Sequence, residues 1–234
     1  MQIPVLSVNR TKRKNMNLLE EMELLNIRNE EPRDYETVEN ITRDAFYNMY
    51  IPGCVEHYLV HIMRAHEDFI RELDFVLELD GEVVGYIMYT KATLTDEAGN
   101  VKNILTFGPL CIEPKYQRRG YGKLLIQHSF EKAASMAYDT VVIFGTPSNY
   151  VSSGFVSCKK HNVCVEGDKF PSAMLIRELK PGVLDGRKWY YRDSPVMAVL
   201  PEDANAYDDT LIPKERKHTP TQEEFYIMSH SFVE

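Results

Sequence analysis

The sequence predicts an α/β protein with a mixed sheet flanked by helices, and three observations carry this prediction. First, an apolar strand pattern over residues 103–112 leads through a basic turn into a helical pattern over residues 123–138. Second, the run 141–144 is short and apolar throughout, as expected of a strand buried on both faces. Third, two upstream strand patterns meet at Asp80-Gly81, a strong hairpin signal. A strand, crossover helix and strand make a parallel unit, whereas a hairpin is antiparallel, so the sheet contains both kinds of pairing.

The patterns upstream of the parallel unit predict, in order, a strand over 24–28, a helix over 34–49, a helix over 55–71 and hairpin strands over 73–79 and 82–90. Asp34 is expected to cap the first of these helices, because a short acidic side chain can accept bonds from the first helical N–H groups. Pro52-Gly53 separates the two helices, since neither residue favours a helix interior.

Gly108 and Pro109 interrupt the strand pattern that precedes the basic turn. Proline has no N–H to donate to a sheet ladder and is confined to sheet edges and bulges. Glycine is also typical of a bulge. We therefore expect the fourth strand to distort near residues 108–110, where its pairing loosens.

The chain after the parallel unit predicts a short helix over 148–153, capped by Gly154, and last strands over 155–157 and 173–178. The pattern then changes, with an aromatic cluster at Trp189-Tyr190-Tyr191. We divide the chain into an N-terminal extension (1–24), a domain (25–180) and a C-terminal extension (181–234). The last segment is expected to pack on the domain or to form a subunit contact, as in a homodimer.

The composition limits the class of protein. The 234 residues are 44% hydrophobic, which suits one domain, or one domain with an appended segment. No stretch approaches the roughly 20 apolar residues of a membrane span, and the N-terminus lacks an apolar signal core. The cysteines form no Cys-x-x-Cys pair, so we expect reduced thiols in a cytoplasmic protein. The net charge of −8 argues against nucleic-acid binding and mildly favours a cationic substrate.

The second predicted helix carries His57 and His61 one turn apart, a spacing at which two histidines can share a metal ion. The helix has no His-Glu-x-x-His motif, and no third ligand is evident. We therefore predict ordinary surface or half-buried histidines and no metal site.

Residues 117–122, Gln-Arg-Arg-Gly-Tyr-Gly, form the basic turn that opens the long helix. The first N–H groups of a helix have no partner within it, and the helix dipole favours negative charge there. Gly120 and Gly122 let the main chain approach a phosphate closely. The turn is not a P-loop, because Gln117 stands where that motif needs glycine. It is not a dinucleotide fingerprint either, because Leu125 replaces the third glycine.

The pattern Gln-x-x-Gly-x-Gly between an apolar strand and a helix resembles the pyrophosphate loop of the GCN5-related N-acetyltransferases, the GNAT family. The order of elements over about residues 25–180, including Tyr150-Val-Ser-Ser-Gly-Phe155, is also similar to this family. The resemblance implies a GNAT-like fold, in which the parallel fourth and fifth strands splay apart and the pantetheine arm of acetyl-CoA enters the gap. It implies these cofactor-binding residues: Leu110, Cys111, Ile112, Gln117, Arg118, Arg119, Gly120, Tyr121, Gly122, Lys123 and Asn149. The strand residues would bind through their main chain, while the basic side chains either complement phosphate or are simply solvated.

Acyl transfer from a thioester to a primary amine needs two oriented reactants, a donor to the oxyanion and a proton for the leaving sulfur. A backbone N–H near Leu110 or Cys111 is the natural oxyanion donor. Tyr150 stands in the Tyr-x-x-x-Gly-Phe setting of the family's catalytic tyrosine, so the resemblance implies that it is the general acid. The other interpretation is a tyrosine that packs at a helix start.

The sequence departs from the family in two places. Several members carry a glutamate base on the fourth strand, where this chain has about Thr106. Glu113 lies nearby, and a water chain is an equal alternative. Many members end the fifth strand with asparagine, where this chain has Phe144-Gly145, and Asn149 is the candidate substitute.

The acceptor is not identified by any motif. The first two helices flank the acceptor site in the resembled family, so Tyr47, Tyr50 and His57 either line the substrate cleft or pack in the core. The main hypothesis is a cytoplasmic acetyl-CoA-dependent N-acetyltransferase. The alternatives are an acyl-CoA-binding sensor or assembly module without turnover, and a protein that binds another phosphate-bearing ligand.

Overall fold

The computed structural model describes residues 24–234, so the predicted N-terminal extension (1–24) lies outside the described residues except for Leu24. The strands are β1 (Leu25–Asn29), β2 (Phe75–Leu79), β3 (Glu82–Asp96), β4 (Val101–Ile112), β5 (Thr140–Phe144), β6 (Val156–Ser157), β7 (Val163–Cys164), β8 (Met174–Glu178) and β9 (Trp189–Arg192). The α-helices are α3 (Tyr35–Phe46), α4 (Glu56–Met63), α5 (Tyr121–Ser135), α6 (Pro147–Tyr150), α7 (Pro201–Asp208) and α8 (Pro220–Ser229). Short 3-10 helices are η2 (Pro32–Asp34), η3 (Arg71–Leu73), η4 (Pro114–Tyr116), η5 (Val151–Ser153), η6 (Cys158–His161) and η7 (Pro195–Met197).

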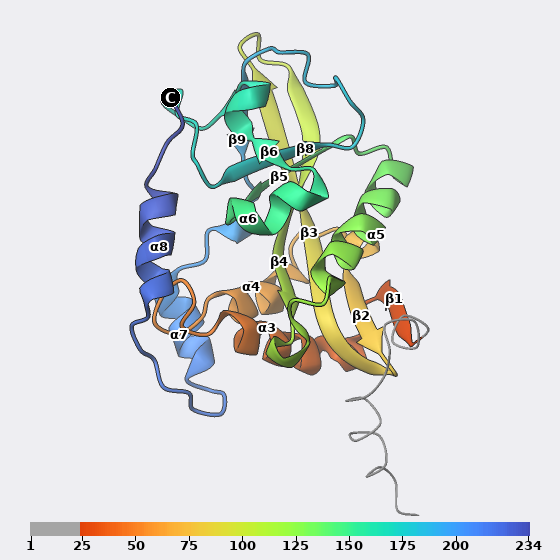
Figure 1. Ribbon diagram of the computed structural model, residues 1–234, viewed down its shortest axis with the longest axis vertical. Coiled ribbons are helices and arrows are strands. Elements are labelled where there is room, and N and C mark those ends of the chain that lie inside the picture. The colour runs from red at the N-terminus through yellow and green to blue at the C-terminus, as the bar shows by residue number, and fades with distance from the viewer. Residues whose placement is uncertain (1–23) are drawn as a thin grey trace, which may run out of the picture.

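Within residues 24–234 the strands form one nine-stranded sheet in the order β1-β2-β3-β4-β5-β8-β6, and β9 pairs with both β3 and β7. The β4–β5 pair is parallel and the pairs β1–β2, β2–β3, β3–β4 and β5–β8 are antiparallel, which confirms the predicted mixed sheet. Figure 1 shows α5 across the near face of the sheet, and α7 and α8 along the side of the molecule away from β1.

The predicted hairpin between β2 and β3 is confirmed. Asp80 and Gly81 both have positive φ, of 52° and 76°, which is the conformation that a two-residue turn of this kind requires. Successive side chains of the hairpin alternate between the faces of the sheet, because the pleat has a period of two. Leu77 belongs to the core that includes α5, whereas Val76 belongs to the core that includes α3 and α4. Both faces of the sheet are therefore buried against helices.

The expected bulge lies at Gly108 and Pro109. Leu110 pairs with Ile87, and Phe107 pairs with Tyr89, so two residues of β4 oppose one residue of β3. Because the extra residue bends the strand, β4 changes direction at this point. The bulge includes Pro109, which has no N–H to donate to the hydrogen bonds between β3 and β4.

The parallel strands β4 and β5 separate soon after they meet. Their register holds one Cα pair, Leu105 with Val141, whereas the other edge of β5 pairs antiparallel with β8 along its whole length. The edge of β4 beyond Leu105 therefore has no partner strand in the described chain. This confirms the splayed parallel pair that the family resemblance implied.

Two helix predictions need correction. The helix predicted over 55–71 ends at Met63, because the chain beyond it turns and pairs with the open edge of β3. There the N–H of Ile70 binds the carbonyl of Tyr89, and the N–H of Lys91 binds that of Asp68. Asp34 precedes α3 but does not cap it, because its carboxylate accepts hydrogen bonds from Arg28 and from the N–H of Glu31.

The chain after residue 180 returns to the same sheet. β9 pairs antiparallel with residues 93–96 of β3, beyond the end of β2. α7 then packs beside α3 and α4, where Asp208 accepts a 2.6 Å hydrogen bond from Nε of buried Arg43. The ring of Phe225 in α8 lies 4.6 Å from that of Tyr50, between centroids. No helix among residues 24–234 is both long and apolar enough to span a bilayer.

Candidate functional site

The turn before α5 leaves backbone donors open. Arg118 and Gly120 both have positive φ, of 64° and 88°, and α5 begins directly after Gly120. The first helical bond joins the N–H of Leu124 to the carbonyl of Gly120. In the described chain, the N–H groups of Arg118, Gly120, Gly122 and Lys123 donate no hydrogen bond. Donors of this kind at a helix start bind anions, because the helix dipole adds to their positive field.

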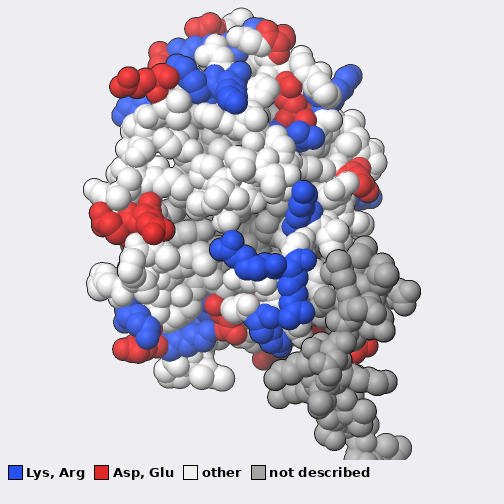
Figure 2. All heavy atoms as spheres, in the orientation of Figure 1, with Lys and Arg blue, Asp and Glu red and all other residues white. Residues whose placement is uncertain are grey.

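A cavity of about 290 Å³ opens beside this turn. Most of the predicted site residues line it: Leu110, Cys111, Ile112, Gln117, Arg118, Gly122, Lys123, Asn149 and Tyr150. Figure 2 shows a hollow near the middle of this face, bordered below by Lys and Arg side chains. The structure thus brings the strand, the turn and the short helix α6 around one space.

Three predicted residues stand apart from the cavity wall. The side chain of Tyr121 is buried in the core that includes α5, so only its main chain faces the turn. The guanidinium of Arg119 lies 5.6 Å from the ring centroid of Tyr116, outside the cavity. Gly120 contributes its backbone alone, and a Cβ built on it would meet no atom within 4 Å. Glycine is needed at this position for its positive φ and not for space.

Leu110, Cys111 and Ile112 line the cavity from the part of β4 that has no pairing with β5. The side chain of Gln117 donates a 3.0 Å hydrogen bond to the carbonyl of Ile112, which ties the turn to the strand. Cys111 points its thiol away toward α3, with Sγ 3.4 Å from Oγ1 of Thr42. Burial raises the pKa of this thiol to about 12, so it is a packing residue and not a nucleophile.

Tyr150 projects into the cavity from α6. Its ring packs against Phe107 of β4, with centroids 5.9 Å apart, and against Phe155, with centroids 5.8 Å apart. These neighbours desolvate the hydroxyl and raise its pKa, so it keeps its proton at neutral pH. The hydroxyl has no hydrogen-bond partner among residues 24–234, which leaves the proton available to a ligand.

The C-terminal end of α3 forms a wall that the motif analysis left open. Phe46, Met49 and Tyr50 line the cavity opposite β4. Burial, assisted by the Glu56 carboxylate, raises the pKa of Tyr50 to about 12. Tyr50 was expected either to line the cleft or to pack, and it does both, because its other face contacts Phe225. The signal for this wall was the family resemblance, in which the first two helices flank the acceptor site.

Tyr47 and His57 do not reach the cavity. Tyr47 donates a hydrogen bond to Asp208 and packs under α7. His57 is fully buried, with Nε2 3.3 Å from Oδ1 of Asp208, although neither ring nitrogen makes a hydrogen bond within the described chain. His61 binds Glu39 instead. No group of three or more His, Cys, Asp or Glu residues in the range 24–234 is placed to hold a metal ion.

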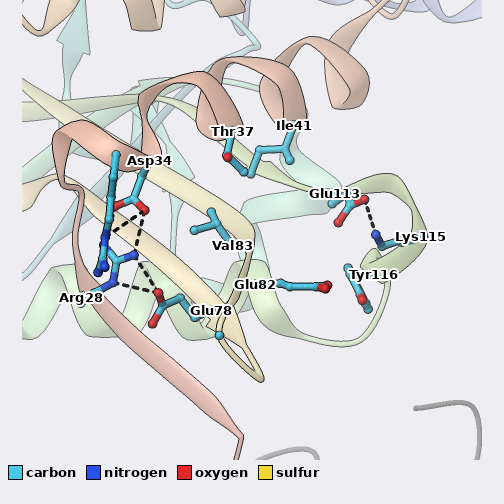
Figure 3. Close-up of a pocket in the computed structure, with 12 residues that line it drawn as sticks. Arg28, Asp34, Thr37, Ile41, Glu78, Glu82, Val83, Glu113, Lys115 and Tyr116 are labelled. Atoms are coloured by element: carbon cyan, nitrogen blue, oxygen red, sulfur yellow. Dashed lines mark hydrogen bonds and ion pairs between the residues drawn. The ribbon is translucent and has the colours of Figure 1, made fainter. Parts of the chain in front are cut away.

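A second cavity, of about 770 Å³, lies beside the turn between β2 and β3 (Figure 3). Arg28 bridges Asp34 and Glu78 across it, with N–O distances of 2.5 and 2.7 Å. Lys115 pairs with Glu113 at 2.6 Å on the opposite wall. These ion pairs join β1, β2 and the start of α3, so we interpret them as parts of the scaffold. Glu113, one candidate base from the sequence, points into this cavity and is held by Lys115.

The fold and the open donors define the class: an α/β protein whose parallel strands part beside the N-terminus of a helix that leaves backbone N–H groups open. The chain belongs to the acetyltransferase (GNAT) family, whose model matches residues 36–158. This match confirms the family resemblance carried by residues 117–122.

The relatives agree with this assignment. The chain is 33% identical over 87 residues to the uncharacterized N-acetyltransferase YjhQ of Escherichia coli K12, a match covering 37% of this chain and 47% of YjhQ. The alignment thus spans about half the length of that relative. The GNAT family N-acetyltransferase YhbS of Escherichia coli, solved in complex with CoA, superposes with a TM-score of 0.64 at 21% identity, over 75% of this chain and 93% of YhbS. A GNAT family acetyltransferase of Brucella melitensis, solved in complex with acetyl-CoA, superposes with a TM-score of 0.58 at 20% identity. This superposition covers 74% of this chain and 97% of the Brucella protein. These superpositions show a shared fold.

Proposed function

We propose that this protein is an acetyl-CoA-dependent N-acetyltransferase that transfers the acetyl group to a primary amine by direct attack. The observation that carries the proposal is the convergence of three features on one cavity. These are the open N–H groups at the start of α5, the partnerless edge of β4, and the hydroxyl of Tyr150. Diphosphate, pantetheine and thioester need these features in this order along the cleft.

The cofactor would be held mostly by main chain. The N–H groups from Arg118 to Lys123 would bind the diphosphate, and the side chains of Arg118 and Lys123 would add positive charge at the cavity rim. The pantetheine amides would pair with the β4 edge over Leu110–Ile112 in the manner of an added strand. The CoA and acetyl-CoA bound in the two solved relatives support this choice of ligand.

The chemistry follows from these positions. A neutral amine attacks the thioester carbonyl, and a backbone N–H at Leu110 or Cys111 donates to the oxyanion that forms. The C–S bond then breaks, and Tyr150 gives its proton to the thiolate. The burial that raises the pKa of the phenol also raises that of a thiol held in the same cleft, so the transfer stays feasible.

The test is thiol release from acetyl-CoA with a panel of primary amines. Tyr150→Phe is expected to lower kcat by about 10²- to 10⁴-fold, the usual contribution of a general acid. Its Kd for acetyl-CoA should stay within about twofold, since the ring contacts remain. Tyr226→Phe, at an exposed tyrosine of α8, is the matched control and should behave as the parent protein.

The same assay separates the alternatives. Tight binding of acetyl-CoA with no thiol release on any amine would favour a sensor. This alternative is retained because Thr106 stands where several family members carry a glutamate base. Thermal stabilisation by CoA but not by ATP would exclude a general phosphate-binding protein. At ligand a hundredfold above Kd, this stabilisation is about 2.7 kcal/mol. The domain bounds of 25–180, the homodimer and the cytoplasmic location stay predictions.

A further inference from the structure

One face of the sheet carries two separate cores. Met88 and Ala92 of β3 share this face, because successive side chains of a strand alternate between the faces. Met88 packs in the core that includes α3 and α4, whereas Ala92 packs in the core that includes η6 and β9. Phe144, at the end of β5, lies on the same face as Val142 of the second core, yet it is 50% exposed. The face is therefore open to solvent at the end of β5, near the place where β4 and β5 part.

The C-terminal residues 219–233, which we call the strap, are attached to the end of α3. The hydroxyl of Thr221 donates a 2.8 Å hydrogen bond to the carbonyl of Met49, and the side-chain amide of Gln222 donates a 3.1 Å bond to that of Asn48. Met49 also lines the cavity in which the thioester is proposed to lie. The first attachment of the strap is therefore at the rim of the candidate active site.

The other end of the strap is attached next to β5. The N–H of Ser172 donates a 2.9 Å hydrogen bond to the carbonyl of Ser231. The carbonyl of the following residue, Ala173, accepts a 2.9 Å bond from the N–H of Gly145, which directly follows β5. Figure 1 shows α8, the helix of the strap, leading away from α7 toward the C-terminus. The strap thus connects the end of α3 to the end of β5, the two elements that border the cleft.

The helix of the strap does not pack closely on the sheet. None of the residues 220–229 is buried, although a helix laid on a sheet normally buries an apolar stripe. Residues 223–230 make no hydrogen bond to another element within residues 24–234. The 10 residues of α8 span about 15 Å. The strap is therefore a bridge that is held at its two ends and solvated along its length.

A row of aromatic rings connects the cleft to the strap. The rings of Phe46 and Tyr50 are 5.9 Å apart between centroids, and both residues line the cavity. The ring of Phe225 in α8 lies 4.6 Å from that of Tyr50. All three side chains are only partly buried, so each keeps surface that a ligand can contact. The helix also carries Glu223 and Glu224, both exposed, and no Lys or Arg, which favours the approach of a cation.

We propose that the strap selects the acceptor, a small primary amine with an apolar body. The proposal rests on the proposed acetyltransferase function. The cationic amine approaches along the acidic helix, and its apolar body packs on Phe225 and Tyr50. After losing a proton to water, the nitrogen reaches the thioester beside Tyr150. Because both ends of the strap are attached, a polypeptide cannot lay the chain on either side of a lysine across this opening, so peptide lysines are poor acceptors.

The first experiment compares kcat/KM for phenethylamine with that for a lysine-containing peptide. The parent protein is expected to favour phenethylamine by about 100-fold or more. Phe225→Ala should raise the KM for phenethylamine about tenfold, the effect of one lost aromatic contact, and should leave kcat and the Kd for acetyl-CoA within about twofold. Phe225→Tyr keeps the ring and should keep the KM. Tyr226→Ala, at an exposed aromatic residue of the same helix, is the matched control and should behave as the parent protein.

The attachment of the strap is tested by the double variant Thr221→Ala/Gln222→Ala. It removes the side-chain bonds to the end of α3, and the preference for phenethylamine over the peptide should fall about fivefold or more. Ser229→Ala is the control, because its hydroxyl binds the carbonyl of Tyr226 within α8. Equal use of the peptide and phenethylamine by the parent protein, or an unchanged KM in Phe225→Ala, would overturn the proposal.

A binding measurement separates this proposal from the proposed function. Titration calorimetry with phenethylamine in the presence of CoA should show binding that Phe225→Ala weakens about tenfold and Tyr226→Ala leaves unchanged. Acetylation of other amines without such binding would overturn selection by the strap and keep the acetyltransferase function. Binding of this kind, with no thiol release on any amine, would refute the acetyltransferase function and keep the amine site at the strap.

Discussion

The ring of Tyr150 occupies the space where residue 145 would carry a side chain. A Cβ built on Gly145 would come within 2.6 Å of Cε2 of Tyr150, closer than real Cβ contacts allow. Gly145 directly follows β5 and Tyr150 ends α6, so the short connection that includes α6 brings the ring back against the end of β5. The position where many relatives were expected to carry asparagine therefore has a steric role in this chain.

Gly145→Ala is expected to push the Tyr150 ring away and to lower kcat about 10- to 100-fold, since misplacing a catalytic group by about 1 Å can cost that much. Affinity for acetyl-CoA, measured by titration calorimetry, should change less than about threefold. Thr146→Ala, next in the chain, should have no effect. The double variant Gly145→Ala/Tyr150→Phe should be no slower than Tyr150→Phe alone. Additive losses would show that Gly145 does not act through Tyr150.

Gly120→Ala tests the anion site at the start of α5. Gly120 has φ 88° with open space around it, so alanine introduces backbone strain of about 1 kcal/mol without a clash. Relief of this strain would turn the N–H groups, and we expect acetyl-CoA to bind about tenfold more weakly. Gly99→Ala is the matched control, because Gly99 has φ 85° and equally open surroundings in a distant surface turn. Both variants should lose similar stability in urea unfolding, and equal affinities for acetyl-CoA would contradict the site.

His57 makes stability depend on pH. Burial lowers its pKa to about 4, despite the Asp208 carboxylate, so the unfolded chain binds the proton more tightly than the folded chain. Stability is therefore lost as pH falls below the unfolded value of about 6.5, and the loss levels off below about pH 4. Between pH 7 and pH 5 the free energy of unfolding should drop by about 2 kcal/mol on this account. The pKa of Asp208 is also lowered, because hydrogen bonds from Arg43 and Arg216 outweigh its burial, but it acts at lower pH.

Urea unfolding at pH 7 and pH 5 checks this dependence. His57→Gln should flatten the difference between the two pH values, whatever its effect on stability at pH 7. His61→Gln, at a histidine with a half-exposed side chain one turn away, should leave the difference unchanged. A parent protein equally stable at both pH values would show that His57 is not the buried neutral group described above.

Local features could be predicted where one residue type is required by the backbone. Asp80-Gly81 predicted the hairpin because few residues adopt positive φ. Pro109 predicted the bulge because it cannot donate to a ladder. Gly154, with φ 84°, caps the 3-10 helix η5 that directly follows Tyr150, as expected of a C-terminal cap. These signals lie within a few residues of the structure they specify.

Pairing between distant segments could not be predicted in the same way. The helix predicted through Arg71 stops at Met63, because residues 68–70 complete the edge of β3. Arg43 meets Asp208 across 165 residues of chain, and neither residue type identifies the other as its partner. The family resemblance offered Tyr47, Tyr50 and His57 alike as cleft or core residues, and only the fold shows that Tyr50 alone of the three lines the cavity.

The sequence by itself determined the main elements of residues 25–178 and the glycine turn before α5, because short-range backbone preferences and hydrophobic periodicity depend on neighbouring residues. Only the tertiary structure decided that β9 returns to β3, that Met197 lies beside Gly108 at the bulge of β4, and that residues at the end of α3 line the cleft. Such contacts depend on which buried surfaces fit together, and this information is spread over the whole chain.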